Sequence, residues 1–268
     1  MKIDFVDKNE AVNFINKYHY SKILPRITKY YLGVYVEQTL SGVITLGYGT
    51  QPLQTIKKLF NNHEMLSKDY LEIGKMCFLP TLNKDKSFGS KTMSMLVSWI
   101  KNNLKYVSFL YTLADGIMGK AGYVYQASNF KYIGSFWTSV YLDNETMEKI
   151  HPRSAKKLCV ENAEYEHKNK IFWLTQTFCD YKNISKIDGL MFRYIYPLNK
   201  KAMKIYDSYD SYKDLKNPKD KDIVFKKRLS NGKYESIEQP LFNMNTFEHN
   251  HQKPKDKVVI KQLSIFDL

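Results

Sequence analysis

The chain has 268 residues, 43% of them hydrophobic, which is enough to bury a real core in one large or two small domains. Its formal net charge is +14, and residues 207–268 hold 12 Lys and Arg against 10 Asp and Glu, so most of the excess lies in residues 1–206. A basic folded region indicates a polyanionic partner such as nucleic acid, although a Lys-rich proteome would give the same excess.

Cysteine use and the apolar runs exclude two further classes of protein. Cys77, Cys159 and Cys179 show no CxxC spacing, which fits a reducing cytoplasm and no disulfide framework. The first residues are charged rather than signal-like, and no run approaches the ~20 apolar residues that cross a bilayer. We therefore expect a cytoplasmic protein without a membrane partner.

The first third of the chain reads as strands around one helix. Asp7 is a plausible N-cap with Glu10 as its capping-box partner, and an apolar stripe then runs to Tyr18. Apolar runs and a turn signal at residues 39–42 predict a hairpin and a further strand. The strands expected here are residues 3–6, 30–36, 43–48 and 71–79.

The middle and later parts alternate between the two kinds of element. A polar loop at 83–91 precedes a helix, and a buried strand from residue 106 ends on Asp115. The remaining expected elements are helices at 92–101, 123–129, 161–178 and 200–206 and strands at 136–142 and 191–196, with a strand at 172–174 as the alternative to helix there. This order predicts a mixed α/β fold, with helices packed on a twisted sheet.

The composition changes after Tyr206, where polar and charged residues dominate. We expect a catalytic domain over residues 1–206, with residues 146–206 as its C-terminal elaboration. Residues 207–268 are expected to be an extended, partly disordered tail with two small apolar islands, 239–242 and 262–266.

The most specific pattern lies in the middle of the chain. Leu113-Ala114-Asp115 is followed by three spaced glycines, by Tyr123-Val124-Tyr125-Gln126-Ala127-Ser128-Asn129 and by Tyr132-Ile133-Gly134. This pattern resembles the Mom-type phage DNA adenine modification proteins, which are relatives of the GNAT acyltransferases. Weaker matches follow in order, at Tyr18-His19-Tyr20-Ser21, Gly42-Val43-Ile44, the strand around Lys75 and Phe192-Arg193-Tyr194.

The resemblance implies a GNAT-like fold and a target. Members of the family convert the N6 amine of adenine in phage DNA to a carbamoylmethyl derivative, which shields the DNA from host restriction enzymes. The resemblance covers roughly residues 5–206 and leaves the tail outside. Lys75 stands where family members often carry Arg, and Lys120 stands where many have His.

Four residues are candidates for the chemistry. Asp115 ends an apolar strand and is expected to act as a general base, a metal ligand or an acceptor for the adenine amine, with a turn cap as the alternative. Tyr125 falls where acyltransferases of this fold often carry an acid for the leaving thiolate, with core packing as its alternative. Ser128 and His19 complete the set, each with a structural alternative.

An acyl-CoA-like donor is the cofactor that the resemblance implies. A GNAT fold binds the donor's pyrophosphate before a helix N-terminus, where backbone N–H groups are free. Lys86, Gly89, Ser90 and Lys91 occupy that place, although an ordinary polar loop would look the same, and Asn129 is a further candidate. No two histidines have a convincing ligand spacing, so iron or another metal stays an open alternative.

Double-stranded DNA is the expected macromolecular substrate. The N6 amine lies within a base pair, so the enzyme must flip the base and hold it between aromatic faces. The candidates for contact with nucleic acid are Lys75, Lys120, Arg153 and Arg193.

The end of the chain resembles a docking peptide. Gln262, Leu263, Ser264, Ile265 and Phe266 are similar to the motif that binds the bacterial β sliding clamp, with apolar anchors for a groove. An edge strand or a folded-back terminus is the alternative. A tethered enzyme would meet DNA as it is replicated in the host bacterial cytoplasm.

Two rival functions stay open on the sequence. One is an ordinary acyltransferase that acts on protein, tRNA or a small amine, and it predicts acyl-CoA binding without a DNA product. The other is a non-enzymatic effector that occupies the clamp and blocks replication, and it predicts clamp binding without any need for Asp115.

Overall fold

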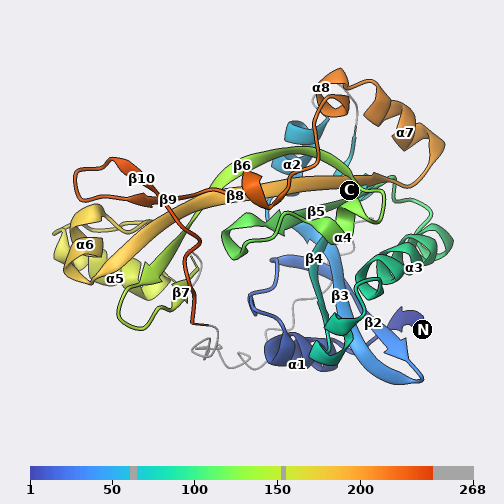
Figure 1. Ribbon diagram of the computed structural model, residues 1–268, viewed down its shortest axis with the longest axis horizontal. Helices are drawn as coiled ribbons and strands as arrows, with labels where there is room; N and C mark the ends of the chain where they lie inside the picture. Colours follow the sequence, from blue (N-terminus) through green and yellow to red (C-terminus); the bar gives the residue numbers. More distant parts are fainter. Residues whose placement is uncertain (61–64, 152–154, 244–268) are drawn as a thin grey trace.

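A computed structural model describes residues 1–60, 65–151 and 155–243. Within these residues, ten strands form one mixed sheet, in the order β1-β2-β3-β4-β5-β8-β6-β7, with β9 paired to β8 and β10 to β9 (Figure 1). The strands are β1 (Lys2–Phe5), β2 (Ile27–Val36), β3 (Thr39–Gly49), β4 (Tyr70–Phe78), β5 (Phe109–Asp115), β6 (Lys131–Asp143), β7 (Lys149–Ile150), β8 (Ile184–Pro197), β9 (Phe225–Arg228) and β10 (Tyr234–Ile237).

Helices cover both faces of this sheet, which confirms the expected α/β class. Successive strand residues point to opposite faces, and α3 packs on one face while α1, α2 and α7 pack on the other. The helices are α1 (Lys8–Tyr18), α2 (Pro52–Leu59), α3 (Phe88–Asn103), α4 (Tyr123–Gln126), α5 (Lys156–Tyr165), α6 (Gln176–Tyr181), α7 (Lys200–Asp207) and α8 (Asp210–Lys213). The sequence analysis did not predict α2.

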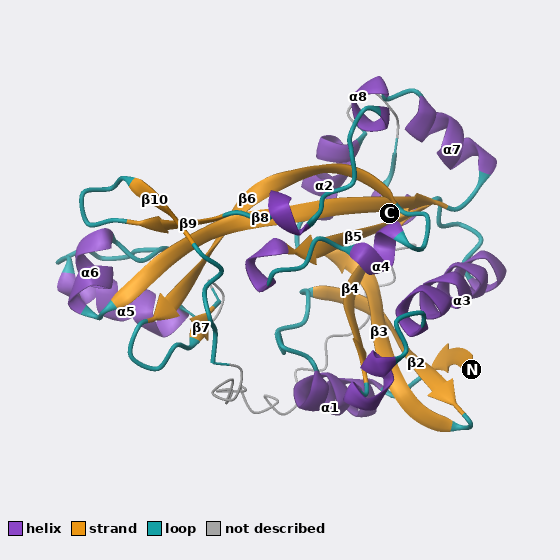
Figure 2. Cartoon of the chain, in the orientation of Figure 1, coloured by secondary structure: helices purple, strands orange, loops and turns teal. Residues whose placement is uncertain are grey.

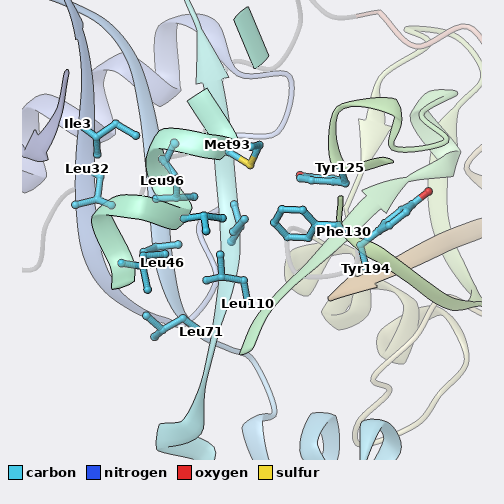
Figure 3. Close-up of a cluster of buried hydrophobic side chains, with 14 of the residues drawn as sticks. Ile3, Leu32, Leu46, Leu71, Met93, Leu96, Leu110, Tyr125, Phe130 and Tyr194 are labelled. Atoms are coloured by element: carbon cyan, nitrogen blue, oxygen red, sulfur yellow. The ribbon is translucent and has the colours of Figure 1, made fainter. Parts of the chain in front are cut away.

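The largest core cluster lies under α3. Met93, Leu96, Val97 and Ile100 recur at helical spacing and are buried against the sheet. Burying each such side chain stabilises the fold by about 1.5–3 kcal/mol. Figure 3 shows three aromatic rings, of Tyr125, Phe130 and Tyr194, gathered beside this aliphatic cluster.

The strands β4 and β5 form a parallel pair that separates before either strand ends. Their register joins Tyr70–Ile73 to Phe109–Thr112 and stops there. Beyond that point β4 continues against β3, across an irregularity at Gly74, while β5 continues against β8 alone. The carboxyl halves of two neighbouring strands therefore diverge, and this opens space at the edge of the sheet where ligands commonly bind.

The strands β6 and β8 are longer than expected and run beyond the rest of the sheet (Figure 2). They carry a lobe made of β7, α5 and α6. The single helix expected over residues 161–178 is wrong, because α5 ends at Tyr165, His167 then has a positive φ of 51°, and Thr175 caps a separate helix. The capping hydroxyl also donates to Asn162, which ties the intervening loop down.

The region expected to be a tail carries structure of its own. β9 pairs with residues 187–189 of β8, and β10 folds back on β9. Backbone pairing along a long strand edge provides partners that the polar composition does not reveal. The expected domain limit at residue 206 stays a prediction. Within the described part of the chain, no helix is both long and apolar enough to cross a membrane.

Candidate active site

A cavity of about 490 Å³ opens where β4 and β5 diverge. This volume lies within the range of about 300–1,000 Å³ that is typical of small-molecule sites. Its walls come from the carboxyl halves of both strands, from the segment after α1, from the glycine turn after β5 and from β7 (Figure 1). Of the predicted site residues that the structure describes, five line it: His19, Lys75, Asp115, Lys120 and Tyr125.

Asp115 lies in this cavity between a lysine and a tyrosine. Its carboxylate lies 3.5 Å from the Lys149 ammonium, and both side chains are largely buried, at 17% and 8% exposure. The Tyr20 hydroxyl donates a hydrogen bond to the same carboxylate. Burial and the negative charge of Asp115 raise the pKa of Tyr20 well above its usual range. The carboxylate is thus held in place from two sides.

His19 follows the last turn of α1 and stacks on Tyr20, with 4.4 Å between the ring centroids. The backbone N–H of Ser21 donates to His19 Nδ1 at 2.9 Å, so Nδ1 carries no proton. Burial, together with the nearby charges of Lys75, Lys120 and Lys149, lowers the pKa of His19 to about 3. The neutral ring therefore carries its proton on Nε2 at neutral pH.

The lowered pKa of His19 predicts a pH-dependent stability. In the unfolded chain His19 has an ordinary pKa of 6.5, so as the pH falls the unfolded state takes up this proton first. The free energy of unfolding is then unaffected by His19 above about pH 6.5 and falls, by at most about 1.4 kcal/mol per pH unit, toward about pH 3. Urea unfolding across this interval should be less pH-dependent in His19→Gln. The exposed His167→Gln is the control and should behave like wild type.

Lys120 and Lys75 reach the same region from opposite walls. The Lys120 ammonium lies 4.0 Å from the centroid of the Tyr20 ring, and Lys75 donates to the Ser21 hydroxyl at 2.9 Å. The surrounding protein lowers the pKa of Lys120 by desolvation, although its side chain stays accessible through the cavity mouth. Both lysines were expected to contact nucleic acid, and the structure places them inside the cavity.

Tyr125 lines the inner end of the cavity and is 8% exposed. Burial raises the pKa of its hydroxyl, which contacts the Thr112 side chain. Ser128 and Asn129 end the same short helix without lining the cavity. The Ser128 hydroxyl donates to the Val124 carbonyl at 2.6 Å, and Asn129 takes a left-handed conformation with φ 63°. These contacts fit the alternative that both residues merely end the helix, and their roles in catalysis and cofactor binding stay predictions.

The glycine turn between Asp115 and Tyr123 is fixed by a buried hydrogen-bond network. The Tyr194 hydroxyl donates to the Ala121 carbonyl, and the Gln126 amide donates to the Tyr194 oxygen at 2.9 Å and to the Pro218 carbonyl at 2.9 Å. Gly122 opens α4 with φ 89° and has no space for a Cβ. The turn that carries Lys120 is therefore rigidly joined to the sheet.

The predicted cofactor loop lies beside the cavity rather than in its wall. Gly89 packs against Val124 of α4, which links this loop to the glycine turn. The Asp85 carboxylate accepts from the Ser87 backbone N–H at 2.8 Å and lies 3.5 Å from the Lys91 ammonium. Ser87, at the N-cap of α3, makes no side-chain capping bond. Acyl-CoA binding by Lys86, Gly89, Ser90 and Lys91 stays a prediction.

The other predicted residues lie elsewhere. Arg193 is on β8 and stacks over the Phe136 ring at 4.5 Å, outside the cavity lining. Its planar contact fits a structural role on that strand as well as a phosphate contact. Arg153 and the peptide formed by Gln262, Leu263, Ser264, Ile265 and Phe266 lie outside the described residues.

The structure adds residues that the sequence analysis did not place at the site. Tyr20, Glu72, Lys149 and His151 line the cavity. Lys149 also contacts the C-terminal segment, because the Phe242 ring lies 5.5 Å from its ammonium. Lys149 and His151 come from the lobe that follows β6, far from Asp115 in sequence and without any local motif.

The described residues contain no cluster of side chains that suits a metal ion. They contain no group of three or more His, Cys, Asp or Glu side chains that could hold a metal ion. The Asp115 carboxylate is engaged by a lysine and a tyrosine instead. We therefore derive no step through a metal.

These features define an α/β protein whose ligand cavity opens between two diverging parallel strands, around a paired carboxylate. The chain belongs to the Mom protein family, whose model matches residues 1–219. It is 29% identical over 195 residues to the methylcarbamoylase Mom of Escherichia phage Mu. The aligned region covers 72% of this chain and 74% of that protein.

A solved structure is also similar. It is a Bacillus subtilis acetyltransferase in complex with CoA, and its sequence is 11% identical. The superposition covers 74% of this chain and 99% of that chain, with a TM-score of 0.38. The family match ends at residue 219, so β9, β10 and the segment that carries Phe242 lie beyond it.

Proposed function

We propose that this protein is a phage DNA modification enzyme that transfers a carbamoylmethyl group to the N6 amine of adenine, which protects the DNA from restriction. The observation that carries the proposal is the Asp115–Lys149–Tyr20 cluster inside a cavity, in a chain of the Mom family. The relative in phage Mu is named a methylcarbamoylase. The expected site of action is the host bacterial cytoplasm.

Asp115 is the group that receives the adenine amine. Its carboxylate accepts a hydrogen bond from N6–H and orients the amine toward the donor, because Lys149 and Tyr20 fix its position. As the new C–N bond forms, the N6 proton passes to Asp115. Tyr125, whose raised pKa keeps its hydroxyl protonated, supplies a proton to the donor's leaving group.

Double-stranded DNA is the proposed substrate, and the target base must leave the helix. The cavity has aromatic walls at Tyr20, Tyr123 and Tyr125, which suits a flipped purine. The net charge of +14 supports attraction to the phosphate backbone at low salt.

An acyl-CoA-like donor would supply the activated group from a CH2 carbon that bears the leaving group, because attack of N6 on an acyl thioester carbonyl gives an amide and not a carbamoylmethyl amine. The N-terminus of α3 suits its phosphates, because Ser87 leaves the helix without a side-chain cap and Lys86 and Lys91 add positive charge. Gly89 allows the backbone of this turn to pack against α4, next to the cavity.

Nucleoside mass spectrometry tests the proposed function. Plasmid DNA from cells that express the protein should contain a deoxyadenosine heavier by a carbamoylmethyl group, and DNA from cells with an empty vector should not. Unmodified deoxyadenosine in both samples, with the protein folded and abundant, would reject adenine modification. The acyltransferase rival would then be tested by acyl-CoA turnover on protein, tRNA and small amines.

We further propose recruitment by the host sliding clamp, from the sequence of residues 262–266 alone. Replacing Leu263 and Phe266 by Ala removes two apolar anchors and should weaken clamp binding by at least about tenfold. Surface plasmon resonance on the immobilised clamp measures this. Ala at Leu241 and Phe242 is the comparison, because residues 239–242 are a poorer version of the motif. Equal binding by the 263/266 variant and wild type would remove the clamp from the proposal.

A further inference from the structure

The cavity holds more positive than negative charge. Among the described residues, three lysines line it, Lys75, Lys120 and Lys149, against two carboxylates, Glu72 and Asp115. Adenine is neutral, so a flipped base does not balance the excess. A buried or partly buried charge without compensation is unfavourable, which indicates that something else in the reaction supplies a negative charge here.

The three ammonium groups converge on one short segment, His19-Tyr20-Ser21. Lys75 bonds to Ser21, and the ammonium groups of Lys120 and Lys149 lie 4.0 Å and 5.9 Å from the centroid of the Tyr20 ring. These contacts come from three different elements, β4, the glycine turn and β7, so the convergence is a tertiary feature.

Lys120 differs from its two neighbours in its partners. Lys149 is paired with Asp115, and Lys75 donates to Ser21. Among the salt bridges of the described residues, none includes Lys120, and its ammonium faces the ring of Tyr20. Its side chain is accessible from the cavity mouth. A cation that makes no salt bridge in the described residues is available to an incoming anion, although the charge of Asp115 lies near enough to act on the pKa of Lys120.

We propose that Lys120, flanked by Lys75 and Lys149, forms an oxyanion site in this cavity, beside Asp115, which takes a phosphate or carboxylate group of a substrate. The desolvation that lowers the pKa of Lys120 supports this, because a bound anion offsets the cost of keeping the ammonium charged. The proposal rests on the proposed function only in assigning that group to a substrate. The oxyanion belongs either to the flipped nucleotide or to the donor.

Binding of inorganic phosphate at fixed ionic strength tests the site without any DNA product. Isothermal titration of the full chain should show phosphate binding that Lys120→Gln weakens by roughly tenfold or more. Lys105→Gln is the matched control, because Lys105 is an exposed lysine outside the cavity and away from the predicted cofactor loop. Equal phosphate affinity in wild type and Lys120→Gln, or an equal loss in both variants, would overturn the proposal.

Further ligands identify the source of the oxyanion. If deoxyadenosine 5′-monophosphate binds more tightly than deoxyadenosine in wild type but not in Lys120→Gln, the site takes the phosphate of the nucleotide. If Lys120→Gln instead weakens the binding of acetate or acetyl-CoA, the site takes an oxyanion of the donor. If Lys120→Gln binds all these ligands with the same affinity as wild type, the site is rejected. Phosphate binding that persists without adenine modification would reject the proposed function and leave the oxyanion site standing.

Discussion

Asp115→Asn is expected to reduce adenine modification of DNA by at least about a hundredfold, because the amide no longer accepts the amine proton. The substitution keeps the shape of the side chain and an oxygen that accepts from Tyr20. It leaves the Lys149 ammonium, whose side chain is 8% exposed, without its counter-ion. We therefore also expect a loss of folding free energy of about 1–3 kcal/mol.

Asp188→Asn provides the matched control for this experiment. The Asp188 carboxylate is also 17% exposed and pairs with a strand lysine, Lys186, at 3.9 Å, and it accepts from the Ser139 hydroxyl at 2.6 Å. It lies outside the cavity lining. The same isosteric change should therefore affect stability but not product, as measured by urea unfolding and nucleoside mass spectrometry. If Asp115→Asn retained as much product as Asp188→Asn, the assigned role of Asp115 would be wrong.

The sequence predicted the parts of the fold that local patterns control. The apolar spacing in α3, the N-cap Asp7 of α1 and the apolar strand that ends on Asp115 each act within a few residues. α2 was missed because its amphipathic stripe is only eight residues long. The prediction of one helix at 161–178 was wrong because the chain turns at His167, which has a positive φ. The sequence has no glycine there to indicate the turn.

The site shows the same division between local and long-range information. Asp115 and Tyr125 lie within one motif, and the structure places both at the cavity. Lys149 and Tyr20 approach Asp115 from elements far away in sequence, so their contacts follow from sheet topology rather than from spacing. Contact of Lys75 and Lys120 with DNA stays a prediction, and their place in the cavity wall was not expected, since the sequence alone cannot tell a cavity lysine from a surface lysine.

Gly122→Ala should disable the same cavity through the backbone. Gly122 has φ 89°, and a Cβ there would lie 2.6 Å from Tyr194 and 2.9 Å from the Ala114 Cβ. The left-handed conformation costs about 1–2 kcal/mol for a residue with a side chain, and overpacking adds about 1–3 kcal/mol. The turn that carries Lys120 must then shift, and a displacement of about 1 Å can reduce a rate about a hundredfold.

Gly232→Ala separates the two causes of that loss. Gly232 also has a positive φ, of 79°, but a Cβ there meets nothing within 4 Å, and it lies in the turn between β9 and β10. Gly232→Ala should lose only the folding free energy that the left-handed conformation costs, and it should modify adenine as well as wild type does. Urea unfolding should therefore place Gly122→Ala below Gly232→Ala in stability, and mass spectrometry should find product only with Gly232→Ala. Equal modification by both variants would mean that the position of the glycine turn does not limit the chemistry.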